Sequence, residues 1–254
     1  MIDIDAFDAT VQVLKSAKRV AALTGAGIST LCGIPDFRGP KGLYGKPGAE
    51  RIFDIDCFDR DPGVYYSGCR DLVYDLGRFK PGPVHVALKH LEDAGRLHGI
   101  ITQNIDMLHT KAGSSNVYEI HGSPSLHRCR RCNGAKTFEE ILAMIEAHGG
   151  LSVLGDGFIP RCACGGVYKP DIVFFGEPLP EKAFAGAHEL AARADLLLVL
   201  GTSLTVFPAA GLPRVTLQKG GKIVVVNAQP TMYDDYAFAR FNDLAEFSDR
   251  ILSL

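Results

Sequence analysis

Four of the seven cysteines form two close pairs that could hold a metal ion. Cys129 and Cys132 form a C-x-x-C pair, Cys162 and Cys164 form a C-x-C pair, and 29 residues separate the two pairs. Two pairs of thiolates joined by an insert are typical of a structural Zn²⁺ site with four ligands. Arginines beside both pairs would offset part of the negative charge of such a centre. The alternatives are four buried thiols, or a zinc ribbon whose arginines contact nucleic acid.

A glycine turn near the N-terminus could bind a pyrophosphate. Gly25 and Gly27 follow a short apolar run that ends at Thr24. Glycines at such a turn let the backbone approach a phosphate, and a helix that starts near Ser29 would point its N–H groups at the charge. Thr30 replaces the third glycine of G-x-G-x-x-G, and no acidic residue closes the next strand. A dinucleotide would therefore bind in a non-standard way, and a purely structural turn is the alternative.

One of the eight histidines stands where a catalytic base could act. His121 follows an apolar run over 116–120 and precedes Gly122. An imidazole changes its charge near neutral pH, which suits a general base. Position alone does not distinguish this role from a structural one.

The segments that must position these residues predict an α/β fold with a mostly parallel sheet. Apolar, strand-sized runs alternate with segments of helical periodicity. Ligands of such sheets bind beyond the carboxyl ends of the strands, so the glycines and polar residues that follow the strands should meet in one crevice. Residues 35–83 predict a loop followed by short helices. Strands are predicted over 19–24, 99–102, 116–120, 173–175, 196–200 and 222–226, and helices over 5–17, 85–94, 138–148 and 183–194.

The composition excludes several classes of protein. Hydrophobic residues make up 46% and charged residues 22%, as in ordinary globular chains. A net charge of −2 gives no general attraction to nucleic acid or to anionic membranes. No apolar run reaches the roughly 20 residues of a membrane helix, and the first residues lack the layout of a signal peptide. With an odd number of cysteines, these features predict a cytoplasmic protein without a disulfide framework.

Together the motifs resemble those of the sirtuin family, the NAD-dependent protein-lysine deacylases, and in particular its bacterial and archaeal zinc-containing members. The resemblance covers essentially the whole chain, and the motifs occur in the family's order. They are 25–29 (GAGIS), 33–38 (GIPDFR), 102–106 (TQNID), 119–122 (EIHG), the two cysteine pairs, 173–177 (VFFGE), 201–203 (GTS) and 226–227 (VN).

The resemblance implies a Rossmann-like, mostly parallel sheet with helices on both faces, and a smaller domain made of a zinc-binding insertion and a helical insertion. NAD would lie in a groove between the two. The expected parts are 1–37, 84–125 and 171–254 for the Rossmann-like NAD-binding domain, 38–83 for the cofactor loop and helical module, and 126–170 for the zinc-binding module.

The implied activity is deacetylation with NAD⁺ as a co-substrate and Zn²⁺ as a structural ion. The carbonyl oxygen of an acetyl-lysine attacks C1′ of the nicotinamide ribose as nicotinamide leaves. His121 then acts as the base on a ribose hydroxyl, and water completes the reaction. The products are free lysine, nicotinamide and O-acetyl-ADP-ribose. A closing loop that excludes water would suit this chemistry.

The resemblance also assigns site residues. His121, Asn104 and Asp106 form the catalytic set, Phe37 shields the sugar, and Arg38 meets phosphate. Asn104 orients a water or a ribose hydroxyl, and Asp106 holds the nicotinamide amide together with its neighbour Ile105. The expected cofactor-binding residues are Gly25, Ala26, Gly27, Ser29, Asp36, Phe37, Arg38, Gln103, Asn104, Ile105, Asp106, Gly201, Thr202, Ser203, Asn227 and Ala245, with Leu244 as the alternative to Ala245.

The substrate is an acetylated protein or peptide, which would bind as a strand between the domains through backbone bonds. It would lie between 173–177 and 205–208. Val173 and Phe174 would line an apolar tunnel for the acyl-lysine, with ordinary core packing as the alternative. The expected substrate-binding residues are Val173, Phe174, Phe175, Gly176, Glu177 and Val206.

The type of acyl group follows from a missing pair of residues. The desuccinylating branch of the family reads the acyl carboxylate with Tyr-x-x-Arg. Here Gly68 stands three residues after Tyr65, Cys69 stands three after Tyr66, and Arg70 has the wrong spacing. A buried carboxylate without a cation costs several kcal/mol. Deacetylation is therefore expected first, other neutral acyl groups are possible, and desuccinylation should be poor.

Two other functions remain as alternatives. Mono-ADP-ribosylation of protein would use the same activation of NAD with a different acceptor. A non-catalytic NAD or zinc binding module would need no base. The presence of His121, Asn104, Asp106, Phe37 and Arg38 together argues against a decayed site. Membranes and nucleic acid are not expected as partners.

Overall fold

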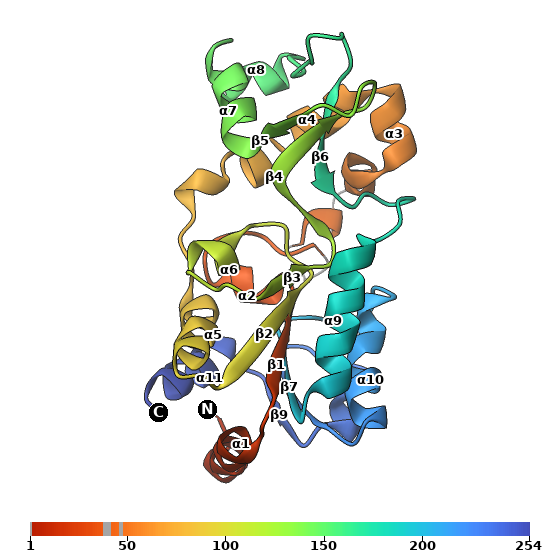
Figure 1. The fold of residues 1–254 in the computed structure, drawn as a ribbon. Helices are drawn as coiled ribbons and strands as arrows, with labels where there is room; N and C mark the ends of the chain where they lie inside the picture. The colour runs from red at the N-terminus through yellow and green to blue at the C-terminus, as the bar shows by residue number, and fades with distance from the viewer. Residues whose placement is uncertain (1, 38–41, 46–47) are drawn as a thin grey trace.

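The computed structural model describes residues 2–37, 42–45 and 48–254 of the chain. It contains a larger and a smaller sheet at opposite ends of the molecule (Figure 1). The helices between 55 and 68 and the helices of the cysteine segment all lie at the end that carries the smaller sheet (Figure 1). Within the described ranges, no helix is both long and apolar enough to cross a membrane.

The larger sheet has six parallel strands in the order β3-β2-β1-β7-β8-β9. Two sets of three strands that meet at the β1–β7 pair give the strand order of a Rossmann fold. Thr24 at the end of β1 pairs with Thr102 of β2 and with Leu200 of β7, so the strands end at one edge. The predicted fold class is confirmed. The strands are β1 (Val20–Thr24), β2 (Leu97–Thr102), β3 (Val117–Glu119), β7 (Leu196–Leu200), β8 (Lys222–Val226) and β9 (Ala239–Phe241).

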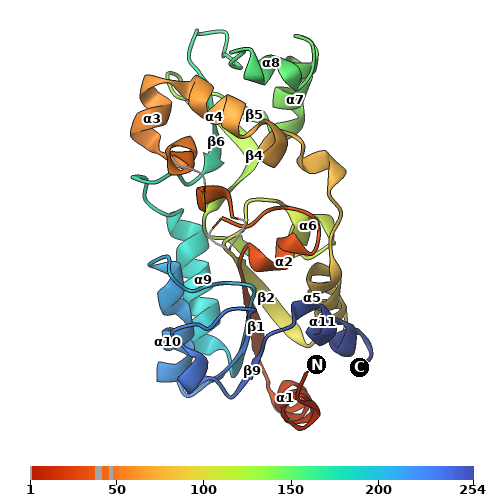
Figure 2. The ribbon, with the colours of Figure 1, turned by 180° about the vertical axis from the view of Figure 1, so that it is seen from behind.

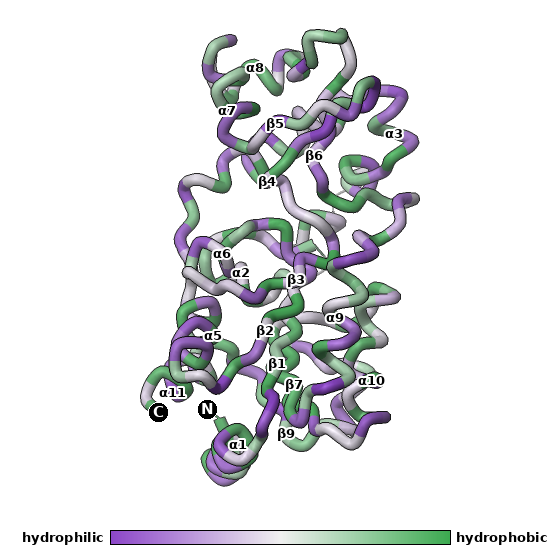
Figure 3. Tube along the Cα trace, viewed as in Figure 1, coloured by the Kyte–Doolittle hydropathy of each residue, from purple (hydrophilic) through white to green (hydrophobic). Residues whose placement is uncertain are grey.

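Helices cover both faces of this sheet, because successive side chains of a strand point to opposite sides. Ala22 and Leu198 pack on the face covered by α1, α5 and α11, and Leu23 and Val199 pack on the face covered by α9 and α10. Both views show this division (Figure 1, Figure 2), and the central strands are hydrophobic along their length (Figure 3). Strands covered on both faces need such continuous apolar runs. The helices are α1 (Ile4–Ser16), α2 (Gly27–Thr30), α5 (Pro83–Asp93), α6 (Leu108–Lys111), α9 (Glu181–Arg193), α10 (Leu212–Gln218) and α11 (Leu244–Leu252).

The smaller sheet is antiparallel, with the order β5-β4-β6. Helix α7 starts from it with a capping box between Thr137 and Glu140. A second apolar core, which includes Tyr65, Tyr66 and Tyr74, joins these elements to α3 and α4. The two predicted insertions therefore share one core. The elements are β4 (Gly122–Cys129), β5 (Ala135–Thr137), β6 (Tyr168–Ile172), α3 (Ile55–Arg60), α4 (Pro62–Gly68), α7 (Phe138–Glu146), α8 (Ser152–Gly155) and the short helices Leu43–Gly45, Ala49–Phe53, Arg70–Tyr74, Leu76–Arg78, Ala209–Gly211 and Asp234–Tyr236.

The strand predicted over 173–175 is wrong, since β6 ends before it and this segment belongs to neither sheet. The Val173 N–H donates to the His121 carbonyl at 2.9 Å, and the Phe175 N–H donates to the Phe53 carbonyl at 2.7 Å. The 173–175 segment thus forms hydrogen bonds with two separate parts of the chain and does not pair continuously with a neighbouring strand.

The other predicted elements are confirmed, with ends that differ by at most two residues. The helix expected near Ser29 is the single turn α2. The elements that were not predicted are β4, β5, β6, β9, α6, α8, α10 and α11. The proposed module boundaries after residues 125 and 170 fall inside β4 and β6. The exact division of the chain into modules stays a proposal.

Candidate active site and metal centre

The carboxyl ends of the parallel strands border a cavity of about 660 Å³. Loops that follow β1, β2, β3, β7 and β8 all contribute to its wall, as expected for this strand order. Small-molecule sites commonly have volumes of roughly 300–1,000 Å³. The predicted residues that line the cavity are Gly25, Ala26, Gly27, Asp36, Phe37, Gln103, Asn104, Ile105, His121, Val173, Phe174, Phe175, Gly176, Glu177, Gly201, Thr202, Ser203, Val206, Asn227 and Ala245.

The glycines of the first loop are required by the close contact between two loops. The Gly27 N–H donates to the Gly201 carbonyl at 2.8 Å. A Cβ on Gly25 would lie 2.7 Å from the Thr202 Cβ, and a Cβ on Gly27 would lie 2.8 Å from the Gly201 oxygen. The close contact between the two loops is therefore enough to explain why both positions are glycine. The same contact brings both loops into the cavity wall, where their backbones can approach a ligand.

A buried network lies directly behind this wall. The Ser29 hydroxyl donates to Asp106 at 2.6 Å, and the Asn104 amide donates to the Ser29 Oγ at 3.1 Å and to the Gly25 carbonyl at 3.2 Å. Asp106 also accepts the Leu108 N–H at 2.9 Å. Because the Nδ2 group of Asn104 is engaged inward, its Oδ1 is the atom that it can offer to a ligand. Ser29 and Asp106 thus support Asn104 from behind the wall.

A second buried chain fixes the ends of β1 and β2. The Thr24 hydroxyl donates to the Thr102 hydroxyl at 2.9 Å, and the Asn104 N–H donates to the same Thr102 oxygen at 3.1 Å. His109 Nε2 lies 2.9 Å from the Thr24 Oγ1. Burial lowers the pKa of His109 to about 3, so this imidazole stays neutral near neutral pH. Uncharged groups of Thr24, Thr102 and His109 therefore hold the start of the loop that carries Asn104.

His121 is oriented as a base would need to be. Its Nδ1 lies 3.0 Å from the Gln103 carbonyl, which can only accept a hydrogen bond. Nδ1 therefore carries the proton of the neutral ring, and Nε2 carries the lone pair. The His121 carbonyl accepts the Val173 N–H, so the histidine is also tied to the segment expected to bind substrate. The structure brings the predicted base, the predicted NAD-binding residues of the loops after β1, β2 and β7, and this segment to one cavity.

Aromatic rings form the wall nearest the smaller sheet. Phe37 packs against Tyr44 and Phe53, with ring centroids 5.4 and 5.9 Å apart, and Phe53 packs against Phe174 at 5.7 Å. Among the described lining residues there is no lysine or arginine. Such a wall favours a neutral, apolar group over a charged one.

Sequence reasoning missed part of the wall. Tyr44 and Phe53 lie in the loop-rich stretch where no periodicity marks a role, and Asn242 and Asp243 follow β9, a strand of three residues that is too short to predict. Arg38, the predicted phosphate contact, lies outside the described residues. The missed lining residues are Thr30, Leu31, Tyr44, Phe53, Ile172, Leu179, Ala228, Gln229, Asn242 and Asp243. Phe207 of the predicted 205–208 segment and Leu244, the alternative to Ala245, also line the cavity.

The four predicted metal ligands lie together at one end of the smaller sheet. All four sulfur atoms lie within 4.8 Å of one another. Cys129 and Cys164 are 3.4 Å apart, and Cys132 and Cys162 are 3.7 Å apart. Tetrahedral Zn²⁺ with Zn–S bonds of about 2.3 Å needs sulfurs about 3.8 Å apart. A hydrogen bond from Tyr168 lowers the pKa of Cys162 to about 6, whereas contacts with the other three cysteines raise the pKa of Cys132 to about 11. The residues fit Zn²⁺.

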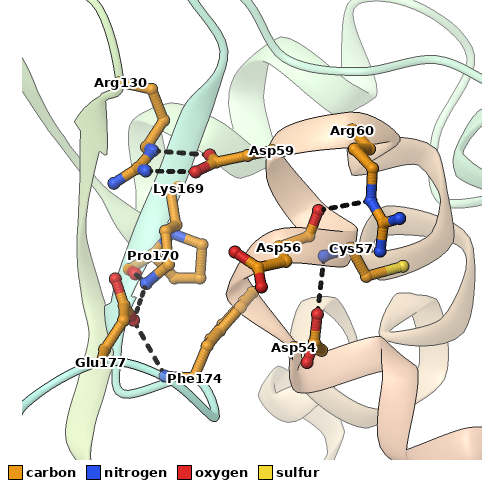
Figure 4. Close-up of polar contacts among 10 residues, drawn as sticks. All are labelled: Asp54, Asp56, Cys57, Asp59, Arg60, Arg130, Lys169, Pro170, Phe174 and Glu177. Atoms are coloured by element: carbon orange, nitrogen blue, oxygen red, sulfur yellow. Dashed lines mark hydrogen bonds and ion pairs between the residues drawn. The ribbon is translucent and has the colours of Figure 1, made fainter.

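The arginines beside the cysteines bind other parts of the protein. Arg130 forms a bidentate ion pair with Asp59 of α3, Arg128 pairs with Asp171, and the Arg131 guanidinium donates to the Cys164 carbonyl. Figure 4 shows the Arg130–Asp59 pair, which joins the strand end beside Cys129 to the helical insertion. These contacts disfavour the alternative of a zinc ribbon that contacts nucleic acid.

Comparisons with known proteins agree with this geometry. A model of the Sir2 family matches residues 25–208. The chain is 41% identical over 244 residues to an NAD-dependent protein deacetylase of Thermotoga maritima, with 95% of each chain covered. It is 40% identical over 221 residues to an NAD-dependent protein deacylase of Pyrococcus furiosus, with 87% of this chain and 86% of the relative covered. The fold is similar to that of a Sir2 protein with a p53 peptide and NAD⁺, with a TM-score of 0.86, 39% identity and 97% of each chain covered.

Proposed function

The chain belongs to the Sir2 family, the sirtuins, and from this premise we propose that it removes acetyl groups from protein lysines with NAD⁺ as the co-substrate. The reaction yields free lysine, nicotinamide and O-acetyl-ADP-ribose. The observation that carries the proposal is the placement of His121. Its Nδ1 is fixed by the Gln103 carbonyl, and it lines one cavity with the NAD loops and the 173–177 segment.

The roles of the residues follow from this geometry. When bound, NAD⁺ supplies the electrophilic C1′ and accepts the acetyl group. His121 Nε2 is the base that takes a proton from a ribose hydroxyl, because Nδ1 is committed to Gln103. Asn104 presents its Oδ1 to a hydroxyl or a water, since its amide N–H groups are engaged by Ser29 and Gly25. The Phe37 ring keeps water from the reacting carbon.

The substrate is an acetylated peptide that pairs with backbone at the mouth of the cavity. Gly176 makes no backbone hydrogen bond to another described residue, and it follows the exposed Phe175. Phe207 on the opposite segment is 66% exposed and also lines the cavity. A peptide strand between these segments would gain backbone bonds at Gly176 and cover both rings. The acetyl-lysine would then enter toward Phe174 and Phe53.

The proposed place of action is the cytoplasm. The predicted zinc ligands Cys129, Cys132, Cys162 and Cys164 must stay reduced to bind the ion, and the cytoplasm keeps thiols reduced. The same compartment supplies NAD⁺.

Nicotinamide release by the wild-type protein tests the proposal. We expect release from NAD⁺ to depend on an acetyl-lysine peptide and to match the O-acetyl-ADP-ribose formed. Release without peptide, with label from NAD⁺ on protein, would instead favour mono-ADP-ribosyl transfer. No release with any acyl peptide, from protein that holds zinc and NAD⁺, would leave a binding module as the better account.

Succinyl-lysine should be a poor substrate. We expect kcat/KM for a succinylated peptide to be at least about a hundredfold below that for the acetylated peptide, because a buried carboxylate without a cation costs several kcal/mol. Arg70, the cation that follows Tyr65 and Tyr66 in the sequence, is half-exposed and forms a bidentate pair with Asp71. The buried Lys169 is already paired with Glu177. A propionylated peptide is the matched control, since it adds bulk without charge. Comparable kcat/KM values for succinyl and acetyl peptides would contradict this prediction.

A further inference from the structure

Lys169 is a buried lysine beside the cavity that the mechanism above does not use. Its side chain is only 7% exposed, although it lies on a strand of the smaller sheet. The ammonium donates to the Pro170 carbonyl at 3.1 Å and to the Ile172 carbonyl at 2.8 Å, and it pairs with Glu177 at 2.7 Å. An ammonium has three N–H donors, so these partners use all of them.

The partners of Lys169 lie at the two ends of the 173–177 segment, which is proposed to bind the substrate. Pro170 and Ile172 belong to β6, which leads into this segment, and Glu177 is its last residue. The Glu177 oxygen that pairs with Lys169 also accepts the Phe174 N–H at 2.9 Å (Figure 4). Lys169 and Glu177 therefore tie the two ends of the segment together and hold its middle.

Phe174 is the residue on which these contacts converge. The Lys169 ammonium lies 4.0 Å from the centroid of the Phe174 ring, in cation–π contact. This ring is buried, packs against Phe53 and lines the cavity. Val173 and Phe175 are fixed by backbone bonds to other segments, whereas the Phe174 N–H is held by the Glu177 carboxylate. The ion pair thus helps to fix the Phe174 ring, which also packs against Phe53, Phe58 and Tyr65.

We propose that Lys169 is a positioning residue for acyl-lysine binding, which acts through Glu177 and the Phe174 ring. This inference rests on the proposed function and adds a residue that does not itself touch the substrate. Without the ammonium, the Glu177 carboxylate would lose its cation and turn toward the solvent to which it is 23% exposed. The Phe174 N–H would then lose its acceptor, and the wall of the acyl-lysine tunnel would lose its fixed position.

The charge of Lys169 is coupled to Glu177. Burial lowers the pKa of Lys169, and Glu177 opposes that shift by hydrogen bond and by charge. The charged form of the buried lysine therefore depends on its carboxylate partner.

Peptide affinity without NAD⁺ tests this inference apart from catalysis. Fluorescence anisotropy would give the Kd of a labelled acetyl-lysine peptide for wild type, Lys169→Met and Lys169→Arg. We expect Lys169→Met, which keeps the side-chain length and removes the charge, to raise Kd about tenfold. Lys169→Arg keeps a cation and should stay within about threefold of wild type. Lys136→Met is the matched control, because Lys136 pairs with Glu140 at the surface of the same sheet and should leave Kd unchanged.

Steady-state kinetics separate positioning from loss of stability. For Lys169→Met we expect a higher KM for the acetylated peptide, with kcat and the KM for NAD⁺ nearly unchanged. Ile141→Val, in the buried core of the same module, gives a destabilised reference that should leave the peptide KM unchanged.

An unchanged Kd in Lys169→Met would overturn the inference, and so would a fall in kcat together with a rise in the KM for both NAD⁺ and peptide. A wild-type protein that binds the peptide but releases no nicotinamide with NAD⁺ would overturn the proposed function instead and leave the role of Lys169 in binding intact.

Discussion

His121→Ala should lower peptide-dependent nicotinamide release and O-acetyl-ADP-ribose formation together, by about a thousandfold, the usual range of general-base catalysis. The substitution removes the only described histidine in the cavity wall, and with it the Nε2 lone pair that the Gln103 contact sets up. The two products should be followed in one reaction, with NAD⁺ and the acetylated peptide both saturating.

The control is His188→Ala, an exposed histidine on α9 whose removal should leave both rates unchanged. His121→Ala must also keep its zinc, its thermal unfolding temperature and its peptide affinity, so that the loss can be assigned to chemistry. Activity within about tenfold of wild type would contradict the role of His121 as the base.

Removal of zinc should unfold the smaller sheet and abolish activity. Structural zinc binding contributes about 10–16 kcal/mol in zinc-finger peptides, comparable with the roughly 5–15 kcal/mol that stabilises a whole domain. Cys129 ends β4, the central strand of the smaller sheet, whose first residue, Gly122, follows His121. Cys129→Ser, or prolonged chelation of wild type, is expected to lower the thermal unfolding temperature by more than about 10 °C and to leave less than about 1% of the activity.

Zinc per chain, measured by elemental analysis, is the direct readout. Cys32→Ala is the control, since Cys32 lies outside the cluster and its removal should leave one zinc ion per chain. If Cys129→Ser kept one zinc ion and an unchanged unfolding temperature, the four-cysteine site would be wrong.

Local patterns in the sequence were sufficient to predict the strands of the larger sheet and the residues that meet at their ends. The apolar run of 196–200 can be read without any contact information, because a strand buried on both faces needs an apolar residue at every position. The convergence of Gly25, Asn104 and Gly201 on one cavity then follows from parallel strands that end at one edge. The spacing of the two cysteine pairs likewise predicted a metal site, because the geometry of metal ligands constrains nearby residues of the chain.

The path of the chain after β6 was decided by tertiary contacts. Residues 173–175 have the composition of a strand, yet their N–H groups bond to His121, to Phe53 and to the Glu177 side chain, and no pattern in the sequence records those partners. The placement of Asp106 behind the cavity wall has the same origin, because it depends on Ser29, a residue 77 positions away.

The sequence by itself determined the α/β class and predicted the four clustered cysteines as zinc ligands and His121 as the base, because strand periodicity, ligand spacing and family motifs are properties of short segments. Only the tertiary structure decided how the His121 ring is oriented, which aromatic rings line the cavity, and that the buried Lys169 pairs with Glu177. These features depend on contacts between residues far apart in the chain, such as His121 with Gln103 and Lys169 with Glu177, whose distances are fixed only when both sheets and their cores have formed.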